Sequence, residues 1–300
     1  MRVAGVHRFL HASHAQRAET LRFFLRKGLA RIPFLPVRLR LDFGAGDSLA
    51  VWWSYVGSPF RAERRFADYW GNDLEELRFL LWFLRPGMSF FDVGAYHGLY
   101  TLVAATRLGG NGTLVAFEPC AQARRRLQVH LAMNGIPVRR AEAFAVGSSN
   151  GNVALYLDRV DPTMSGLRPH AGRDLAGASR VESIRLDDYC KRTELQFPDL
   201  IKVDVEGGEI GVVRGAEGLL TRSRPLLICE VLDQVTHSWG YPARQILKEL
   251  ESLHYQWFDF CPAGTLAPHT QRTDYPEVRN YLAVPREKIS LVRERLAVPG

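Results

Sequence analysis

Apolar segments of strand length alternate with helical segments over most of the chain, and this alternation constrains the fold more than any other feature. The strand-like segments are residues 89–95, 113–118, 138–146, 200–205, 225–232, 255–260 and 280–284, and the helical ones are 99–108, 121–134, 209–221 and 243–253. Strands and helices that alternate in this way form a largely parallel sheet covered on both faces. The last two strands have no helix between them. We therefore expect a Rossmann-like α/β fold with a seven-stranded, mostly parallel sheet that ends in an antiparallel hairpin.

The pattern also predicts how the chain is divided. Residues 1–60 should form an extension, with an amphipathic helix over about 10–32 and a small hairpin of segments 37–43 and 48–56. Residues 61–300 should form one domain, whose first helix begins near Asn72 and Glu75 in a capping-box pattern. A stretch over about 148–198, rich in Gly, Pro and Ser, contains two strand-like pieces, 152–157 and 180–186. An insertion of this length suggests a lid or binding loop.

Positive charge is concentrated at the N-terminus. The net charge is +7, yet residues 1–40 contain nine Lys or Arg and a single acidic residue, Glu19. The rest of the chain is thus nearly neutral, and we expect no nucleic-acid partner, because such enzymes carry a basic body. The basic helix suits a peripheral contact with an anionic membrane or a protein. A helix packed on the domain, or a partly disordered leader, is the alternative.

The cysteines and the apolar runs bear on the compartment. Cys120, Cys190, Cys229 and Cys261 are widely separated and form no Cys-x-x-Cys pair. No apolar run approaches the roughly 20 residues of a membrane span, and the N-terminus lacks the features of a secretory signal. We expect a cytoplasmic protein without disulfide bonds. The oligomeric state stays open.

An acidic, glycine-containing turn follows the first strand of the alternating region. Residues 92–98 read Asp-Val-Gly-Ala-Tyr-His-Gly, and glycines at positions 94 and 98 let the backbone turn sharply and approach a ligand. Dinucleotide-binding folds usually have Gly-x-Gly-x-x-Gly, which seats a pyrophosphate at the helix N-terminus. The carboxylate of Asp92 would repel a pyrophosphate but suits the ammonium group of an amino acid. The turn therefore favours S-adenosylmethionine over NAD.

The second strand ends in Glu118 and Pro119. An acid at this position can accept hydrogen bonds from both hydroxyls of a ribose. This supports nucleoside binding without choosing between the two cofactors. The alternative is an exposed Glu that is favoured simply because a helix begins after it.

The fourth strand carries three ionisable residues on one face. Lys202, Asp204 and Glu206 alternate with apolar residues, although a central parallel strand is normally apolar throughout. Buried ionisable groups are costly unless they are paired or used, and these approach the sheet edge at which α/β folds bind ligands. A structural pair between Lys202 and a carboxylate is the alternative. For Asp204 we favour a role in the site.

Together these motifs resemble the FkbM-type methyltransferases over roughly residues 72–285. The resemblance includes Asp-Val-Gly-Ala-x-x-Gly, Phe-Glu-Pro, Leu-Asp-Asp at 186–188 and, most specifically, Lys-Val-Asp-Val-Glu-Gly-Gly-Glu at 202–209. One departure is Tyr96, where the family commonly has Asn. The resemblance implies methylation of a hydroxyl on a sugar, a glycan or a natural product, with S-adenosylmethionine as the donor.

The resemblance also implies roles for single residues. Asp204 and Glu206 would face the reacting centre. An alcohol must lose its proton during transfer, so a base is expected; Asp204 is the first candidate, followed by Glu230 and His97. Expected cofactor contacts are Asp92, Gly94, Tyr96, Gly98, Glu118, Pro119, Ala145 and Val146, the last two near the adenine. We assign no metal ligands, because without a second clear acidic motif a Mg²⁺ site is disfavoured.

Two other classes of protein stay open at this point. An NAD-dependent oxidoreductase or epimerase would show Gly-x-Gly-x-x-Gly and usually Tyr-x-x-x-Lys, and neither is evident. A non-catalytic module with the same fold would bind a partner through the basic helix. The intact glycine turn and acidic positions argue against lost cofactor binding. Affinity for S-adenosylmethionine separates all three classes.

Overall fold

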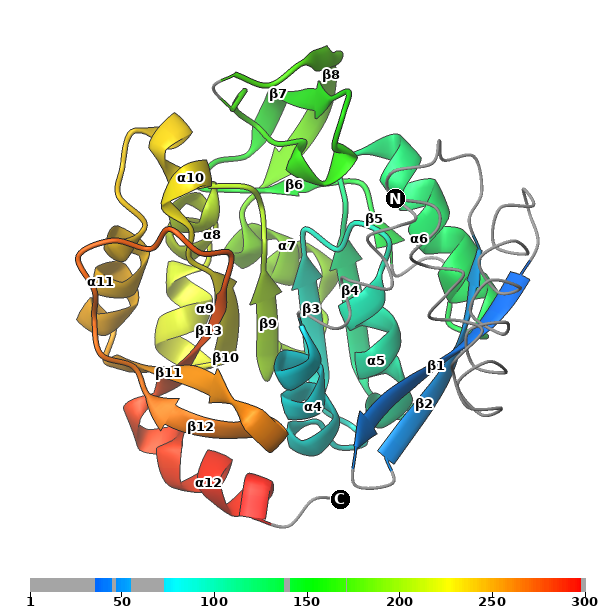
Figure 1. Cartoon of the computed structure of the whole chain (residues 1–300), viewed down its shortest axis with the longest axis vertical. Helices are drawn as coiled ribbons and strands as arrows, with labels where there is room; N and C mark the ends of the chain where they lie inside the picture. Colours follow the sequence, from blue (N-terminus) through cyan, green and yellow to red (C-terminus); the bar gives the residue numbers. More distant parts are fainter. Residues whose placement is uncertain (1–35, 45–46, 55–72, 138–140, 171, 298–300) are drawn as a thin grey trace, which may run out of the picture.

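The computed structural model describes residues 36–44, 47–54, 73–137, 141–170 and 172–297 (Figure 1). The basic helix expected over residues 10–32 and the capping residue Asn72 lie outside these ranges. β1 (Pro36–Gly44) and β2 (Asp47–Ser54) form an antiparallel pair, as the sequence predicts for this segment. β2 runs beside α6 (Ala121–Met133). Within the described ranges, no helix combines the length and apolar character that crossing a membrane requires.

An eight-stranded sheet forms the centre of the molecule, with the order β12-β11-β13-β10-β9-β3-β4-β5. Its strands are β3 (Ser89–Val93), β4 (Thr113–Phe117), β5 (Ala141–Glu142), β9 (Leu200–Val203), β10 (Leu226–Glu230), β11 (Tyr255–Cys261), β12 (Thr265–Pro268) and β13 (Asn280–Pro285). The five strands from β10 to β5 are parallel, and β13 runs antiparallel to both β10 and β11. After β4 and β5 the chain crosses β3 to place β9 on its other side. Open α/β sheets bind ligands at such a switch point.

The sheet differs from the prediction in two details. It has eight strands and not seven, because the short strand β12 pairs with β11 at the edge. Of the strand predicted over 138–146, residues 138–140 lie outside the described ranges and residues 141–146 do not form one strand. β5 borders the main sheet, and the chain then leaves it to form β6 (Ala145–Val146) in a second, three-stranded sheet. The antiparallel pairing of β11 and β13, the last two predicted strands, is confirmed.

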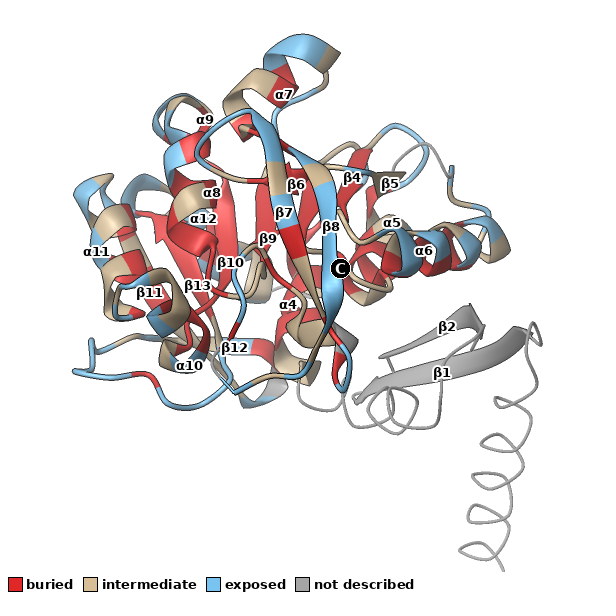
Figure 2. Ribbon diagram, turned by 90° about the horizontal axis from the view of Figure 1, so that it is seen from above, coloured by how far each residue is buried: buried red, intermediate tan, exposed pale blue. Residues whose placement is uncertain are grey.

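Helices cover both faces of the sheet. One core lies under α4 (Leu74–Phe83), α5 (Leu99–Leu108), α6 and α12 (Ile289–Ala297); the other lies under α7 (Leu186–Thr193), α8 (Glu209–Gly215), α9 (Glu217–Arg222) and α11 (Arg244–Ser252). Successive strand residues point to opposite faces, so Phe91 joins one core and Phe90 the other. The central strands are buried, and the outer faces of the helices are exposed (Figure 2).

The second sheet stands over the carboxyl ends of the central strands (Figure 1). β7 (Gly151–Asp158) and β8 (Leu175–Ile184) form an antiparallel hairpin, and β6 pairs with β8. The two strand-like pieces predicted within the insertion correspond to β7 and β8, although β8 begins earlier and α7 starts at Leu186. We call β7, β8 and the loop between them the lid.

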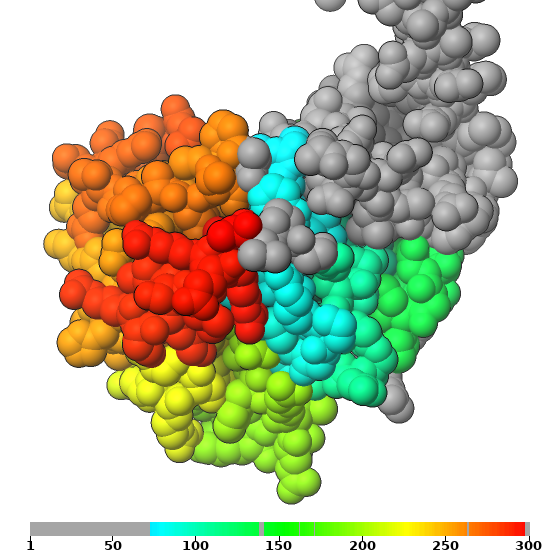
Figure 3. All heavy atoms as spheres, turned by 90° about the horizontal axis from the view of Figure 1, so that it is seen from below, coloured from blue at the N-terminus to red at the C-terminus, as the bar shows by residue number. Residues whose placement is uncertain are grey.

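The end of the described chain packs against the start of the domain. α12 lies against α4 (Figure 3). Arg295 donates from Nη1 to the carbonyl oxygen of Phe83 over 3.3 Å and places its guanidinium 4.9 Å from the centre of that ring. α12 therefore packs on the same core as α4, at the end of the molecule opposite the lid (Figure 1).

Candidate active site

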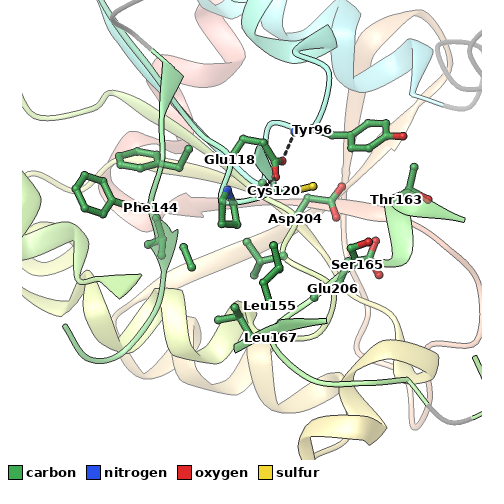
Figure 4. A pocket seen from close by; sticks show the side chains of 17 residues that line it. Tyr96, Glu118, Cys120, Phe144, Leu155, Thr163, Ser165, Leu167, Asp204 and Glu206 are labelled. Carbon is green, nitrogen blue, oxygen red and sulfur yellow. Dashed lines mark hydrogen bonds between the residues drawn. The ribbon is translucent and has the colours of Figure 1, made fainter. Parts of the chain in front are cut away.

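A pocket lies where the carboxyl ends of β3, β4 and β9 meet the lid (Figure 4). The charged side chains that line it are the carboxylates of Glu118, Asp204 and Glu206, and no described Lys or Arg is among its lining residues. Pro119, Phe144, Ala145, Val146 and Leu155 supply apolar walls. The pocket is thus acidic at one end and apolar at the other.

Gly94 shapes the first loop of the pocket. Its φ is +84°, and a Cβ there would lie 1.7 Å from the carbonyl oxygen of Asp204. The amides of Gly94 and Ala95 both donate to the carbonyl oxygen of Phe117 at 3.0 Å. A glycine is therefore needed for the loop to pass between the ends of β4 and β9.

Glu118 lies at the end of β4 and uses both carboxylate oxygens. Oε2 accepts from the amide of Tyr96 and Oε1 from the amide of Cys120, each at 2.8 Å. Burial raises the pKa of Glu118 to about 7, although these two hydrogen bonds oppose the shift. Glu118 therefore links the loop after β3 to the segment after β4 at the rim of the pocket.

Tyr96 and His97 differ in their relation to the pocket. Tyr96 has a left-handed backbone with φ 47°, and its side chain lines the pocket. The ring of His97 stacks on that of Tyr96 with centroids 3.6 Å apart, but His97 is not a lining residue. Burial lowers the pKa of His97 well below its ordinary value. Its carbonyl oxygen contacts Nδ1 of His130 at 2.8 Å.

Lys202 and Asp204 form an ion pair at the floor of the pocket. The buried ammonium of Lys202 donates to Oδ2 of Asp204 at 3.0 Å and to Oδ1 of Asn280 at 2.8 Å. Burial opposes the charge on Lys202, but the carboxylates around it, with Asp204 the strongest, outweigh burial and raise its pKa. The structural pair considered from the sequence is therefore present. Asp204 also faces the pocket, and its side chain is 37% exposed.

Glu206 lines the pocket next to Asp204 and is much more buried. Its backbone is left-handed, with φ 57°, and its carbonyl oxygen accepts from Nε1 of Trp239 at 3.2 Å. Burial, followed by the nearby charges of Asp204 and Glu209, raises the pKa of Glu206 well above its ordinary value. Burial and these two charges therefore favour the neutral form of the carboxyl.

The other predicted site residues lie behind the pocket wall. Asp92 is buried and accepts from the hydroxyl of Thr101 at 2.5 Å. Gly98, with φ +86°, is the residue before α5, and a Cβ there would meet Leu127 at 2.3 Å. Glu230 is buried at the end of β10, and burial raises its pKa well above the ordinary value. None of these three, nor His97, is a lining residue.

The lid contributes residues that the sequence analysis did not single out. Leu155, Thr163, Ser165 and Leu167 line the pocket, and His170 lies 3.8 Å from Glu206. The signal available in the sequence was the long insertion at 148–198. Which of its residues reach the pocket depends on how the hairpin folds back over the sheet, and no local motif encodes that.

Two further observations concern cysteines and metals. Cys120, Cys190, Cys229 and Cys261 are all free. Among the described residues, no group of three or more His, Cys, Asp or Glu side chains is arranged to hold a metal ion.

The sequence matches the family described as the methyltransferase FkbM domain over residues 92–283. It is 30% identical over 183 residues to the 2-O-methyltransferase NoeI of Sinorhizobium fredii, a match that covers 56% of this chain and 73% of NoeI. It is 27% identical over 193 residues to the AMB antimetabolite synthetase AmbE of Pseudomonas aeruginosa, covering 50% of this chain but 9% of AmbE. Among solved structures, a methyltransferase FkbM from Methylobacillus flagellatus aligns with a TM-score of 0.43 and 16% identity, over 66% of this chain and 43% of that chain.

Proposed function

The chain belongs to the FkbM methyltransferase family, and we propose that it moves the methyl group of S-adenosylmethionine to a hydroxyl oxygen of a sugar, a glycan or a natural product. The observation that carries this proposal is the lining of the pocket, which includes three carboxyl groups and no described Lys or Arg. Such a lining offers no cationic side chain to the pyrophosphate of NAD, whereas carboxyl groups suit a cation. An NAD-dependent enzyme is therefore disfavoured.

The residues present fit the proposed cofactor. When bound, S-adenosylmethionine supplies a methyl carbon on a positively charged sulfur, and the S–C electron pair stays on sulfur as the methyl leaves. Each oxygen of Glu118 accepts one amide and retains a lone pair for a ribose hydroxyl. Ala145 and Val146, with Phe144 beside them, offer an apolar slot for the adenine. Asp92 and Gly98 would shape the loop without touching the cofactor.

The acceptor would meet Asp204 and Glu206 at the acidic end of the pocket. Both side chains line it, and the lid adds Thr163 and Ser165, which can hydrogen-bond a neutral acceptor rich in hydroxyls. Holding such an acceptor in line with the methyl group lowers the barrier by several kcal/mol. The name of the relative NoeI, a 2-O-methyltransferase, also supports oxygen as the methylated atom.

The remaining expectations stay predictions. They are the cytoplasmic location, the division at residue 60, and the contact of the basic N-terminal segment with a membrane or a protein. A requirement for Mg²⁺ stays disfavoured, and a non-catalytic role is the second alternative. Chelation of divalent ions should leave turnover unchanged.

Methyl transfer to defined acceptors tests the proposal. We expect full-length protein and methyl-labelled S-adenosylmethionine to methylate at least one of a panel of methyl glycosides of hexoses and deoxyhexoses. Asp204→Asn should preserve the circular dichroism spectrum and affinity for S-adenosylhomocysteine, yet lower turnover by about 10²-fold, since a carboxylate that positions the reacting hydroxyl is lost. Wild-type turnover in this variant would remove Asp204 from the mechanism. Lost folding or cofactor binding would show that it acts only as the partner of Lys202.

A further inference from the structure

The lid places a histidine beside Glu206 that no step above uses. His170 lies in the loop before β8 and is 8% exposed. Its Nε2 is buried, has no hydrogen-bond partner among the described residues, and lies 3.8 Å from Oε2 of Glu206. A buried polar atom without a partner is costly in a folded protein, which points to a role for this nitrogen when the site is occupied.

The other ring nitrogen fixes which proton His170 carries. The hydroxyl of Ser238 donates to the carbonyl oxygen of Val235 at 2.7 Å. A hydroxyl has one proton, so the 3.4 Å contact between Ser238 Oγ and His170 Nδ1 requires the imidazole to donate. The neutral ring then carries its proton on Nδ1 and a lone pair on Nε2. That lone pair lies on the side of Glu206.

The two pocket carboxylates differ in what a proton would do to them. A proton that joined Asp204 would break its ion pair with Lys202. A proton on Glu206 instead relieves repulsion from the carboxylates of Asp204 and Glu209, and burial favours the neutral form. The left-handed backbone at Glu206 costs free energy, a feature that clusters at functional sites.

From this geometry we propose that Glu206, positioned by His170, receives the proton of the acceptor hydroxyl, while Asp204 stays ionised and holds that hydroxyl. The inference rests on the proposed function. The acceptor oxygen forms its bond to the methyl carbon as the S–C bond breaks with its electron pair on sulfur. The O–H bond breaks with its pair on the acceptor oxygen, and the proton joins Glu206, whose new O–H donates to Nε2 of His170. The 3.8 Å distance between His170 Nε2 and Glu206 Oε2 would shorten in the complex, because catalytic hydrogen bonds often become shorter when substrate binds.

Other charged groups around His170 and Glu206 affect the pH at which each of the two side chains titrates. Arg173 and Asp158 act on His170, and burial lowers the pKa of this imidazole. The groups that act on Glu206 include Asp204, Glu209, Asp161 and Arg173, together with the buried carboxyl of Glu230. The neutral imidazole is therefore available at neutral pH to accept a hydrogen bond from the protonated carboxyl.

Nitrogen NMR of the full chain bound to S-adenosylhomocysteine tests the pair without needing any acceptor. With ¹⁵N-labelled histidine, and His170→Gln to assign the signal, we expect a proton on Nδ1 and none on Nε2 near neutral pH. Glu206→Gln should shift the titration of His170, because it changes the side chain that lies 3.8 Å from its Nε2, whereas the exposed Glu182→Gln should not. A proton on Nε2, or a titration indifferent to Glu206→Gln, would overturn the inference even if methyl transfer is observed.

The pH profile of turnover on a methylated glycoside from the panel tests the role of the pair. His170→Gln should lower kcat about tenfold or more and shift its acidic limb to lower pH by about one unit, with KM and affinity for S-adenosylhomocysteine unchanged. Glu206→Gln should remove the acidic limb, and Asp204→Asn should keep it. His237, whose side chain is 67% exposed, provides the control His237→Gln, with wild-type kcat. An unchanged acidic limb in His170→Gln would contradict the inference. If no glycoside is methylated, the proposed acceptor class fails, and the NMR result still decides whether the pair exists.

Discussion

Gly94 determines the shape of the loop that follows β3 more than its neighbours in that loop do. Two separate constraints act on it: a left-handed backbone, and a carbonyl oxygen 1.7 Å from where a Cβ would stand. The first constraint alone costs about 1 kcal/mol for a residue with a Cβ. The second cannot be relieved by a side chain, because the contact is with the backbone of Asp204. Two other glycines separate these effects.

Gly94→Ala should lower the free energy of unfolding by at least about 3 kcal/mol, through backbone strain and overpacking together. Gly87→Ala adds a Cβ at φ +84° with nothing within 4 Å, so it should cost only about 1 kcal/mol. Gly110 also has open space around it and no such φ, and Gly110→Ala should be nearly neutral. Urea unfolding of the three variants measures each effect. Equal stabilities for Gly94→Ala and Gly87→Ala would show that the backbone of Asp204 does not resist a Cβ at position 94.

How well single site residues could be predicted depended on their distance along the chain from a local motif. Gly94 and Glu118 follow strands directly, so their place at the sheet edge was readable, and both lie in the pocket. Asp92 was predicted as a cofactor contact; it is buried within β3, does not line the pocket and is bonded to Thr101. His170 could not be predicted, because its place next to Glu206 depends on a hairpin that folds across the sheet.

At the level of elements, the lid differs from the rest of the pocket wall in how it is attached to the main body and in how exposed it is. It pairs with the main body through the short strand β6, and most of β8 is exposed, whereas the central strands are buried (Figure 2). Residues 138–146 were predicted as one strand because apolar composition does not reveal where a chain passes from one sheet to another. The same switch, from β5 to β6, is what brings Ala145 and Val146 under the lid.

Hydrogen exchange should detect the lid as a binding element. We expect saturating S-adenosylhomocysteine to slow amide exchange in residues 155–167 at least about tenfold, because ordering the pocket wall suppresses local opening. The amides of α12, which lies away from the lid against α4, should not change. Protection confined to residues 92–120, with none in 155–167, would show that the lid takes no part in cofactor binding.

Across the whole molecule, the buried carboxyl groups make stability depend on pH. Burial raises the pKa of Glu76, Glu118 and Glu209 to about 7. Between pH 4.5 and 7 the folded chain keeps protons that the unfolded chain has released, so each such group lowers stability as pH rises. The effect reaches about 1.4 kcal/mol per pH unit for each group. The fall in stability with rising pH is thus a consequence of burying several carboxyl groups in and around the site.

Glu76→Gln should therefore weaken the dependence of stability on pH. Urea unfolding between pH 5.5 and 7.5 should show a shallower fall in stability for this variant than for the wild type, by up to about 1.4 kcal/mol per pH unit. Glu217→Gln changes an exposed carboxylate and should leave the wild-type slope intact. Identical slopes for Glu76→Gln and the wild type would show that Glu76 is ionised in the folded protein.

The central claim, an adenosyl cofactor whose ribose is held by Glu118, is tested most directly by calorimetry with S-adenosylhomocysteine at pH 6 and pH 8. An ionised Glu118 is needed to accept from the ribose hydroxyls, and its pKa is about 7. Affinity should thus rise about tenfold between the two pH values. Glu118→Gln should bind more weakly at pH 8 by roughly 1–3 kcal/mol and lose the pH dependence, and NAD should not bind the wild type. Tighter binding of NAD than of S-adenosylhomocysteine, or an affinity that Glu118→Gln leaves unchanged, would contradict the account.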